Sequence, residues 1–215
     1  MKTLRRKKLR LEPLEVRTVM TGNVTAVVQG GVLVVKGDND DNGIAITQTE
    51  TGSFLVEGDE TTTVNGSAAF ESTGNVRSFR IDMKGGDDAV AIQDLEVRQF
   101  LTLDGGAGND VLSISNVSVG VIAAIRGGAG DDDIAVESLD VGATLLIDAG
   151  KGVNSIDVSG SEGSLLLINA KKGTDTVTKL DNDFDVSLQP SLKLKAKVAD
   201  ALFASWEKAF ARVRF

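Results

Sequence analysis

Apolar residues recur along most of this chain with a period of about 22, from Val76 to about Leu180. Within each period they alternate with polar residues in three short runs. This alternation predicts three short strands per period, with their apolar side chains facing a shared interior. A period of this length, with three strands and three turns, is typical of a solenoid in which each coil buries its apolar side by stacking on the next. The sequence therefore predicts an all-β fold, a parallel β-helix or β-roll-like solenoid.

The period can be followed column by column, and each predicted strand supplies two apolar columns. The first strand supplies Val90, Leu112, Ile134, Ile156 and Val177 beside Ile92, Ile114, Val136 and Val158; the second supplies Leu95, Val117 and Leu139 beside Val97, Val119 and Val141; the third supplies Phe79, Leu101, Ala123, Leu145 and Leu166 beside Ile81, Leu103, Ile125, Ile147 and Ile168. Intervening residues such as Ser113 and Asp157 are expected to point outward.

Four regions follow from the pattern. Residues 1–22 form a basic leader or disordered tail, 23–75 a β-rich N-terminal cap, 76–190 the solenoid, and 191–215 a C-terminal strand and helix. In the cap, alternation predicts strands over 25–28, 31–36, 44–48 and 53–57, with a hairpin turn at Thr51-Gly52.

The C-terminal region carries two apolar patterns. Residues 192–198 alternate like a strand, and Val198, Leu202, Trp206 and Phe210 then fall four apart, which predicts an amphipathic helix over 199–212. We expect this helix to cover the last coil. A membrane surface or a partner protein is the alternative contact for its apolar face.

Composition narrows the chemistry. The chain has no His and no Cys, which excludes nucleophilic Cys, His-based acid–base chemistry and the usual zinc, copper and haem ligand sets. The metals that fit are hard cations held by oxygen, with Ca²⁺ first. No apolar run is long enough for a transmembrane span.

Charge is distributed unevenly along the chain. The net charge is −8, but residues 1–17 carry +5, residues 191–215 carry +4, and the middle carries −17. An acidic body argues against nucleic acid as a partner and favours cations or basic surfaces.

The period also aligns an acidic column at one corner of each coil. Its members are Asp88, Asp110, Asp132, Asn154 and Asp175. Carboxylates stacked one strand spacing apart, roughly 4.8 Å, repel one another unless a positive charge lies between them. The column therefore predicts cation binding.

Two corners match the pattern G-G-x-G-x-D-x-(apolar) in full, at 105–112 and 127–134. Here the chain resembles the RTX, or haemolysin-type, calcium-binding repeat. The resemblance implies Ca²⁺ between stacked turns, with Asp110 and Asp132 as side-chain ligands and Asp131 as an acidic neighbour. The matching carbonyl-bearing turns hold Gly106, Gly108, Gly128 and Gly130.

The other corners depart from that pattern. Asp88 follows a half match, Asn154 replaces the acid at the fourth corner, and Lys171 stands where the last corner would need glycine. With one motif per coil, we expect one or two Ca²⁺ ions. The alternative is that Gly-Asn-Asp and Gly-Asp-Asp are simply good turn formers, stacked because the coils stack.

The N-terminal 17 residues contain a Leu-Glu-Pro segment followed by Leu14-Glu15-Val16-Arg17. They resemble the basic leader of large extracellular and surface proteins of planctomycete bacteria. The resemblance implies export and a location outside the cell or on the bacterial cell surface, where millimolar calcium would fill weak sites. The alternative is a disordered basic tail.

Together these features predict a non-enzymatic, calcium-binding structural or adhesion-type module, with a cell-surface protein or a polysaccharide as its partner. The alternative is a carbohydrate-binding or polysaccharide-cleaving parallel β-helix. Aromatic residues, which line sugar grooves, make up only 4% of the chain, and the pattern shows no long loops that would build a cleft.

Overall fold

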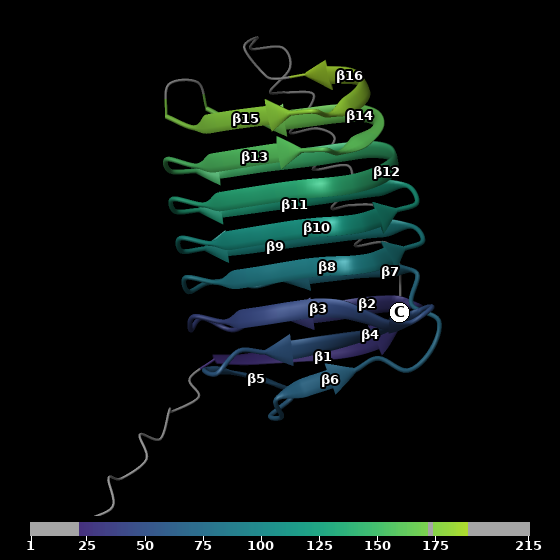
Figure 1. The fold of residues 1–215 in the computed structure, drawn as a ribbon. Helices are drawn as coiled ribbons and strands as arrows, with labels where there is room; N and C mark the ends of the chain where they lie inside the picture. The colour runs from purple at the N-terminus through teal and green to yellow at the C-terminus, as the bar shows by residue number, and fades with distance from the viewer. Residues whose placement is uncertain (1–21, 172–173, 189–215) are drawn as a thin grey trace, which may run out of the picture.

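The computed structural model describes residues 22–171 and 174–188, and these residues form strands and turns without a helix. Figure 1 shows the strands stacked as successive layers of one column. All sixteen strands belong to a single hydrogen-bonded sheet that winds around the interior. The predicted fold class, an all-β parallel solenoid with about 22 residues per coil, is confirmed.

The strands follow one another closely in the chain. They are β1 (Gly22–Gln29), β2 (Val32–Lys36), β3 (Gly43–Glu50), β4 (Ser53–Gly58), β5 (Thr62–Val64), β6 (Ala69–Glu71), β7 (Ser78–Asp82), β8 (Ala89–Val97), β9 (Phe100–Ala107), β10 (Val111–Val119), β11 (Ile122–Ala129), β12 (Asp133–Lys151), β13 (Ser155–Ser159), β14 (Glu162–Asn169), β15 (Thr176–Leu180) and β16 (Asp183–Leu188).

The register between coils repeats the sequence period. Leu112 pairs with Val90 below it and with Ile134 above it, and Ile125 likewise pairs with Leu103 and Ile147. Nearly all residues of the six predicted apolar columns are buried, and most form one continuous core. Burying these aliphatic side chains is the main stabilising contribution, at about 25 cal/mol per Å² of apolar surface.

The strands β8 and β10 each bend once to supply two sides of a coil, and β12, which has the same bend, continues onto the third side, where it pairs with β11. The bends fall at Asp94, Asn116 and Ser138, which all have a left-handed backbone with φ of 53°. Asn116 Nδ2 donates a hydrogen bond of 2.6 Å to Asp94 Oδ1 in the coil below. Short polar residues tolerate this conformation, so the first and second predicted strands of each of these coils are parts of one bent strand.

The stack begins before residue 76. β2 pairs in parallel with β7, and β3 pairs in parallel with β8, so both belong to the first coil. The hairpin predicted at Thr51-Gly52 joins β3 and β4 antiparallel, and β6 pairs antiparallel with β4 to extend this end of the sheet. The predicted leader and the predicted C-terminal strand and helix lie outside the described residues, apart from Gly22.

In the upper coils, some core positions hold residue types that differ from those at the equivalent positions below. Gly163 occupies a position where Val119 and Val141 stand in the coils below, and a Cβ atom there would lie 3.0 Å from the ring of Phe184 in the next coil. The Phe184 ring packs against the core beside this glycine. Ser161 is also buried, and its hydroxyl accepts a hydrogen bond of 3.1 Å from Leu139 N.

Glycines at the acidic corner let successive coils approach closely. Gly106, Gly128 and Gly150 stack in register with φ of 110°, 126° and 88°. A Cβ atom at Gly128 would collide with the carbonyl of Gly106, and one at Gly150 would collide with the carbonyl of Gly128. These positions therefore require glycine for space as well as for backbone conformation.

Gly128→Ala should destabilise the fold more than Gly66→Ala, the matched control. Gly66 also has a positive φ, 75°, but nothing lies within 4 Å of the Cβ that alanine would add. The control should lose about 1–2 kcal/mol of unfolding free energy from left-handed strain, and Gly128→Ala at least twice that loss because its methyl group also meets backbone. Urea unfolding measures both. Equal losses would show that the coils can separate at no cost.

Candidate functional site

A buried column of carboxylates runs up one corner of the solenoid. Asp88, Asp110 and Asp132 lie one coil apart and are 1%, 0% and 2% exposed. Each follows a glycine-containing turn and directly precedes β8, β10 or β12, so the repeating backbone brings all three side chains to equivalent places. The predicted placement of Asp110 beside Asp132 in neighbouring coils is observed.

One oxygen of each carboxylate binds the backbone of the coil below. Asp132 Oδ1 accepts a hydrogen bond of 3.1 Å from Asp110 N, and Asp110 Oδ1 accepts one of 2.9 Å from Asp88 N. Asp88 Oδ1 accepts one of 2.8 Å from Asn42 N. Backbone N–H groups favour the charged form of a carboxylate, so this ladder offsets part of the cost of burial.

The other oxygen of each carboxylate has no hydrogen-bond partner. Asp88 Oδ2, Asp110 Oδ2 and Asp132 Oδ2 are all buried and unsatisfied. Asp110 Oδ2 lies over the Cα of Gly105, where a Cβ atom would collide with it and would also lie 2.7 Å from the carbonyl oxygen of Gly127 in the next coil. The same arrangement recurs one coil higher, where Asp132 Oδ2 and the carbonyl oxygen of Ala149 crowd the Cα of Gly127. A carboxylate oxygen and a carbonyl oxygen of the next coil thus converge at each of these corners.

The two ends of the column differ in their residues from the three acids at its centre. At the upper end Asn154 replaces the acid, and its Oδ1 accepts a hydrogen bond of 2.9 Å from Asp132 N. Above it, Asp175 Oδ1 accepts a bond of 3.0 Å from Asn154 N, and Asp175 Oδ2 accepts one from the Lys171 backbone N. Both oxygens of Asp175 are therefore satisfied within the chain, whereas each of the three acids below has a hydrogen-bond partner for Oδ1 alone.

At the lower end the column begins with Asn42, a residue that sequence reasoning missed. Asn42 is 2% exposed, and its Nδ2 donates hydrogen bonds to Asp88 Oδ1, Asp38 Oδ1 and the Asp40 carbonyl. The signal was present, because Gly37–Gly43 is also an acidic, glycine-flanked corner. The insertion of β4–β6 hides it by placing Asn42 and Asp88 46 residues apart.

Burial raises the pKa of the three acids. Desolvation is the largest cause for each; hydrogen bonds from Asn42 and Asp88 oppose it at Asp88 and Asp110, and neighbouring carboxylates reinforce it. The pKa of Asp88 rises to about 7 and that of Asp110 to about 6. The pKa of Asp132 is also raised, by burial and by Asp131, against a hydrogen bond from Asp110. Near neutral pH, binding a proton or a cation at each buried Oδ2 would therefore stabilise the folded state.

A second ladder runs along the outside of the same corner. Asn109 N donates a hydrogen bond of 2.7 Å to Asp87 Oδ1, Asp131 N donates one of 2.8 Å to Asn109 Oδ1, and Val153 N donates one of 2.8 Å to Asp131 Oδ1. Asp131, predicted as an acidic neighbour of the site, belongs to this exposed ladder and not to the buried column. Its role as a ligand stays a prediction.

The four predicted glycines lie just before the two ladders: Gly106 and Gly128 near the ends of β9 and β11, and Gly108 and Gly130 in the turns that follow. Gly106, Gly108, Gly128 and Gly130 all have positive φ, between 110° and 142°. Within residues 22–171 and 174–188, no three acidic side chains form a group that could hold a metal ion by themselves. A cation here would therefore rely on carbonyl oxygens of these turns together with the unpartnered carboxylate oxygens, the mixed donor set that Ca²⁺ accepts.

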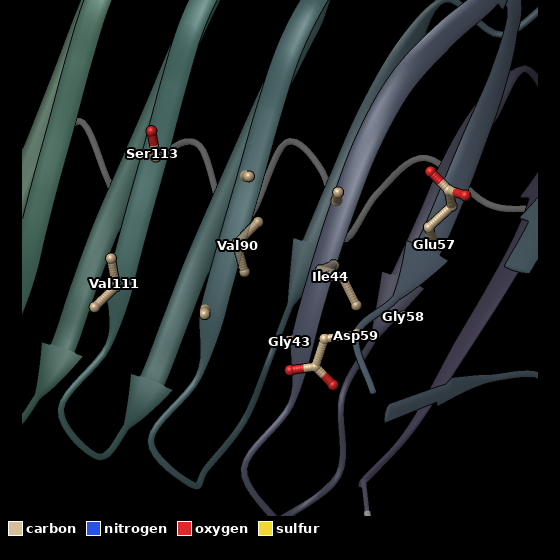
Figure 2. Close-up of a pocket in the computed structure, with 11 residues that line it drawn as sticks. Gly43, Ile44, Glu57, Gly58, Asp59, Val90, Val111 and Ser113 are labelled. Carbon is tan, nitrogen blue, oxygen red and sulfur yellow. The ribbon is translucent and has the colours of Figure 1, made fainter. Parts of the chain in front are cut away.

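A shallow hollow of about 520 Å³ begins beside the acidic corner and extends across the outer face of β3, β8 and β10, where Gly43, Ala89 and Val111 line it. Figure 2 shows Ile44, Val90 and Val111 on these three neighbouring strands, with Asp59 close to Gly43 and Glu57 on β4, the strand next to β3. Asp59 caps its own turn, where Thr61 N and Thr61 Oγ1 donate to its Oδ1 at 2.8 and 2.9 Å.

The lining of this hollow is mainly small and aliphatic, with Glu57 and Asp59 as its acidic residues. No aromatic side chain is among its lining residues. Burial alone would raise the pKa of Asp59, but hydrogen bonds from Thr61 and Thr62 outweigh it and leave that pKa below its ordinary value. A catalytic acid needs the opposite shift.

Comparison with protein-family models, with curated proteins and with solved structures finds no match to this chain. Among the residues that the structure describes, no helix is long and apolar enough to cross a membrane.

The stability of the metal-free protein should fall as pH rises from about 5 to 8. The folded-state pKa values of Asp88, Asp110 and Asp132 lie above the ordinary 3.8, so the folded chain holds protons that the unfolded chain releases. That stabilisation is complete below about pH 4 and is lost as pH rises through about 6 to 7.

Asp38 and Asp59, with lowered pKa values, act only at the acid end, because their contribution is lost below about pH 4. Thermal unfolding in EDTA between about pH 5 and 8 measures the fall in stability that the raised pKa values predict. Asp110→Asn should make the decrease in melting temperature with pH shallower. A melting temperature that stays constant or rises between pH 5 and 8 would contradict the raised pKa values.

Proposed function

We propose that this chain is a non-enzymatic, calcium-binding β-solenoid that serves as an exported or cell-surface structural or adhesion-type module. The observation that carries the proposal is the set of three buried, unpartnered oxygens, Asp88 Oδ2, Asp110 Oδ2 and Asp132 Oδ2. Leaving a buried carboxylate oxygen without a partner costs several kcal/mol, and a divalent cation would offset that cost. The resemblance of the two full corner motifs to RTX repeats supports calcium as the cation.

The residues proposed to hold the ion are Asp110 and Asp132, with carbonyl oxygens of the turns that contain Gly106, Gly108, Gly128 and Gly130. Asp88 is a further candidate because its Oδ2 is also buried and unsatisfied. Asp175 is left out because its two oxygens already accept hydrogen bonds. This selection supports one or two ions along the corner and not one in every coil.

Calcium bound between coils would couple directly to folding, because the oxygens converge only when the coils are stacked. The bound ion supplies positive charge; the chain holds Oδ1 of each acid in the backbone ladder and keeps water from Oδ2 by burial. A protein whose stack tightens in millimolar calcium would gain rigidity on leaving the cell. The partner of its outer surface would be a cell-surface protein or a polysaccharide.

Calcium should raise the melting temperature, and chelation should lower it. Calcium at about 100 times its Kd adds about 2.7 kcal/mol for a single site, which raises Tm by about 5–10 °C in a domain of this size. Scanning calorimetry with calcium and with EDTA at pH 7.5 measures the difference. Magnesium at the same concentration is a control, because its stricter geometry suits this carbonyl-rich corner poorly.

Asparagine variants separate calcium binding from the fold. Asp110→Asn and Asp132→Asn keep an oxygen for the ladder, as Asn154 does at the equivalent position in the coil above Asp132. Without calcium they should melt at or above the wild-type temperature, because a buried charge is removed, and they should lose most of the calcium response. Asp140→Asn makes the same charge change at an exposed position and should retain the full response.

The converse variant is Asn154→Asp, which extends the buried column by one acid. It should melt lower than wild type in EDTA and gain more from calcium. If calcium shifts the melting temperature of none of these proteins, the buried corner is a structural turn and the proposed function is wrong.

A further inference from the structure

The hollow across β3, β8 and β10 is part of a longer apolar trough on the outer face of the stack. The floor of the trough consists of two rows of outward-pointing residues, each in register from strand to strand. The first row is Ala45, Ala91, Ser113 and Ala135, and the second is Gly43, Ala89 and Val111. Val111 is 52% exposed, so the floor presents apolar surface to solvent.

Carboxylates stand at both ends of the trough. The first row continues in register into Glu57 on β4 at one end and into Asp157 on β13 at the other. The second row continues into Asp133 on β12. At its opposite end lies Asp59, whose backbone N–H donates a hydrogen bond of 2.9 Å to the carbonyl of Gly43. All four acids are exposed, so each row of small residues ends in accessible negative charge in both directions.

No basic side chain on these strands neutralises the four acids. β3, β4, β8, β10, β13 and residues 133–141 of β12 contain no Lys or Arg. The salt bridges that join residues within 22–171 and 174–188 both involve Arg126, which belongs to β11 on another side of the stack. The trough therefore combines an apolar floor with uncompensated negative ends, which is complementary to a cationic partner with small apolar side chains.

We propose that the trough binds an extended basic segment of a partner protein, with small apolar side chains on the floor and Lys or Arg at both ends. Its length fits such a segment. Glu57 and Asp157 lie five strand spacings apart, which is about 24 Å at about 4.8 Å per spacing. An extended chain rises about 3.4 Å per residue, so basic residues about seven positions apart reach both ends.

The same charges disfavour other occupants of the trough. A second copy of this chain docked face to face would bring like charges together, and nucleic acid or an anionic polysaccharide would be repelled. The hollow also lacks aromatic side chains that could stack on sugar rings. The proposal goes beyond calcium binding, because the acids of the trough are exposed and are not members of the buried column.

Fluorescence anisotropy of a labelled peptide tests this docking on the full-length protein. The probe is an extended peptide of about nine residues, with Lys at each end and alternating Ala and Ser between them. It should bind, and more weakly as NaCl increases, because exposed ion pairs are screened by salt. Glu57→Gln combined with Asp157→Asn should weaken binding about fivefold or more by removing an ion pair at each end. Glu96→Gln combined with Asp140→Asn makes the same change in net charge at exposed positions on another side and should leave the affinity unchanged.

A variant of the floor separates docking in the trough from general attraction to an acidic protein. Ala91→Phe leaves the charge unchanged but fills the first row, so it should weaken probe binding about fivefold or more through lost contact and steric exclusion. Ser118→Phe places the same ring at an outward position on another side and should have no effect. Circular dichroism confirms that each variant keeps its β structure. If Ala91→Phe fails to fold, Ala135→Phe fills the same row two strands away.

Four outcomes would overturn the proposal. Absence of probe binding at low salt would show that no basic segment of this kind docks on the face. Equal weakening by the trough pair and by the control pair of charge variants would show that the attraction is not local. Binding unchanged by the folded floor variant would place the peptide elsewhere. Competition by spermine as strong as that by unlabelled peptide would assign the trough to small polyamines. Measurements in EDTA as well as in calcium keep the result independent of the proposed calcium site.

Discussion

The structure depends on one repeated contact, in which the Oδ1 atom of a corner Asp or Asn side chain accepts a hydrogen bond from the backbone N–H of the equivalent residue one coil below. The contact recurs at Asp88, Asp110, Asp132, Asn154 and Asp175. It fixes the spacing of the coils at the corner and forces the acids into the interior. Glycine at positions such as 106 and 128 is required because the coils then approach too closely for a Cβ atom. The same contact uses only one oxygen of each acid and leaves the other buried without a partner.

Those remaining oxygens give the corner two alternative states. At low pH a proton satisfies each carboxyl group, as the raised pKa values of Asp88 and Asp110 indicate. At neutral pH the proton leaves, and three like charges stacked in a dry corner oppose the folded state unless a cation replaces it. Protons and calcium are thus proposed to compete for the same oxygens, so calcium would matter most in a neutral medium that contains it.

Local repetition explains why the fold and the buried column could be predicted from the sequence. In a solenoid each residue contacts its equivalent one period away, so residue spacing alone places Leu112 under Ile134 and Asp110 under Asp132. Asn42 was not predicted because an inserted hairpin interrupts the period. Residue spacing also does not determine which side-chain oxygens find hydrogen-bond partners, so the unpartnered Oδ2 atoms could not be predicted.

Calorimetric titration with calcium near neutral pH, repeated in buffers of different ionisation enthalpy, tests the central claim most directly. Binding at the partly protonated carboxyl groups of Asp88 and Asp110 predicts that calcium displaces protons, so the apparent heat should depend on the buffer. Asp110→Asn should reduce both the stoichiometry and the proton release. Calcium binding without proton release would place the ion outside the buried column, and the absence of binding at millimolar calcium would show that the corner carboxylates serve the fold alone.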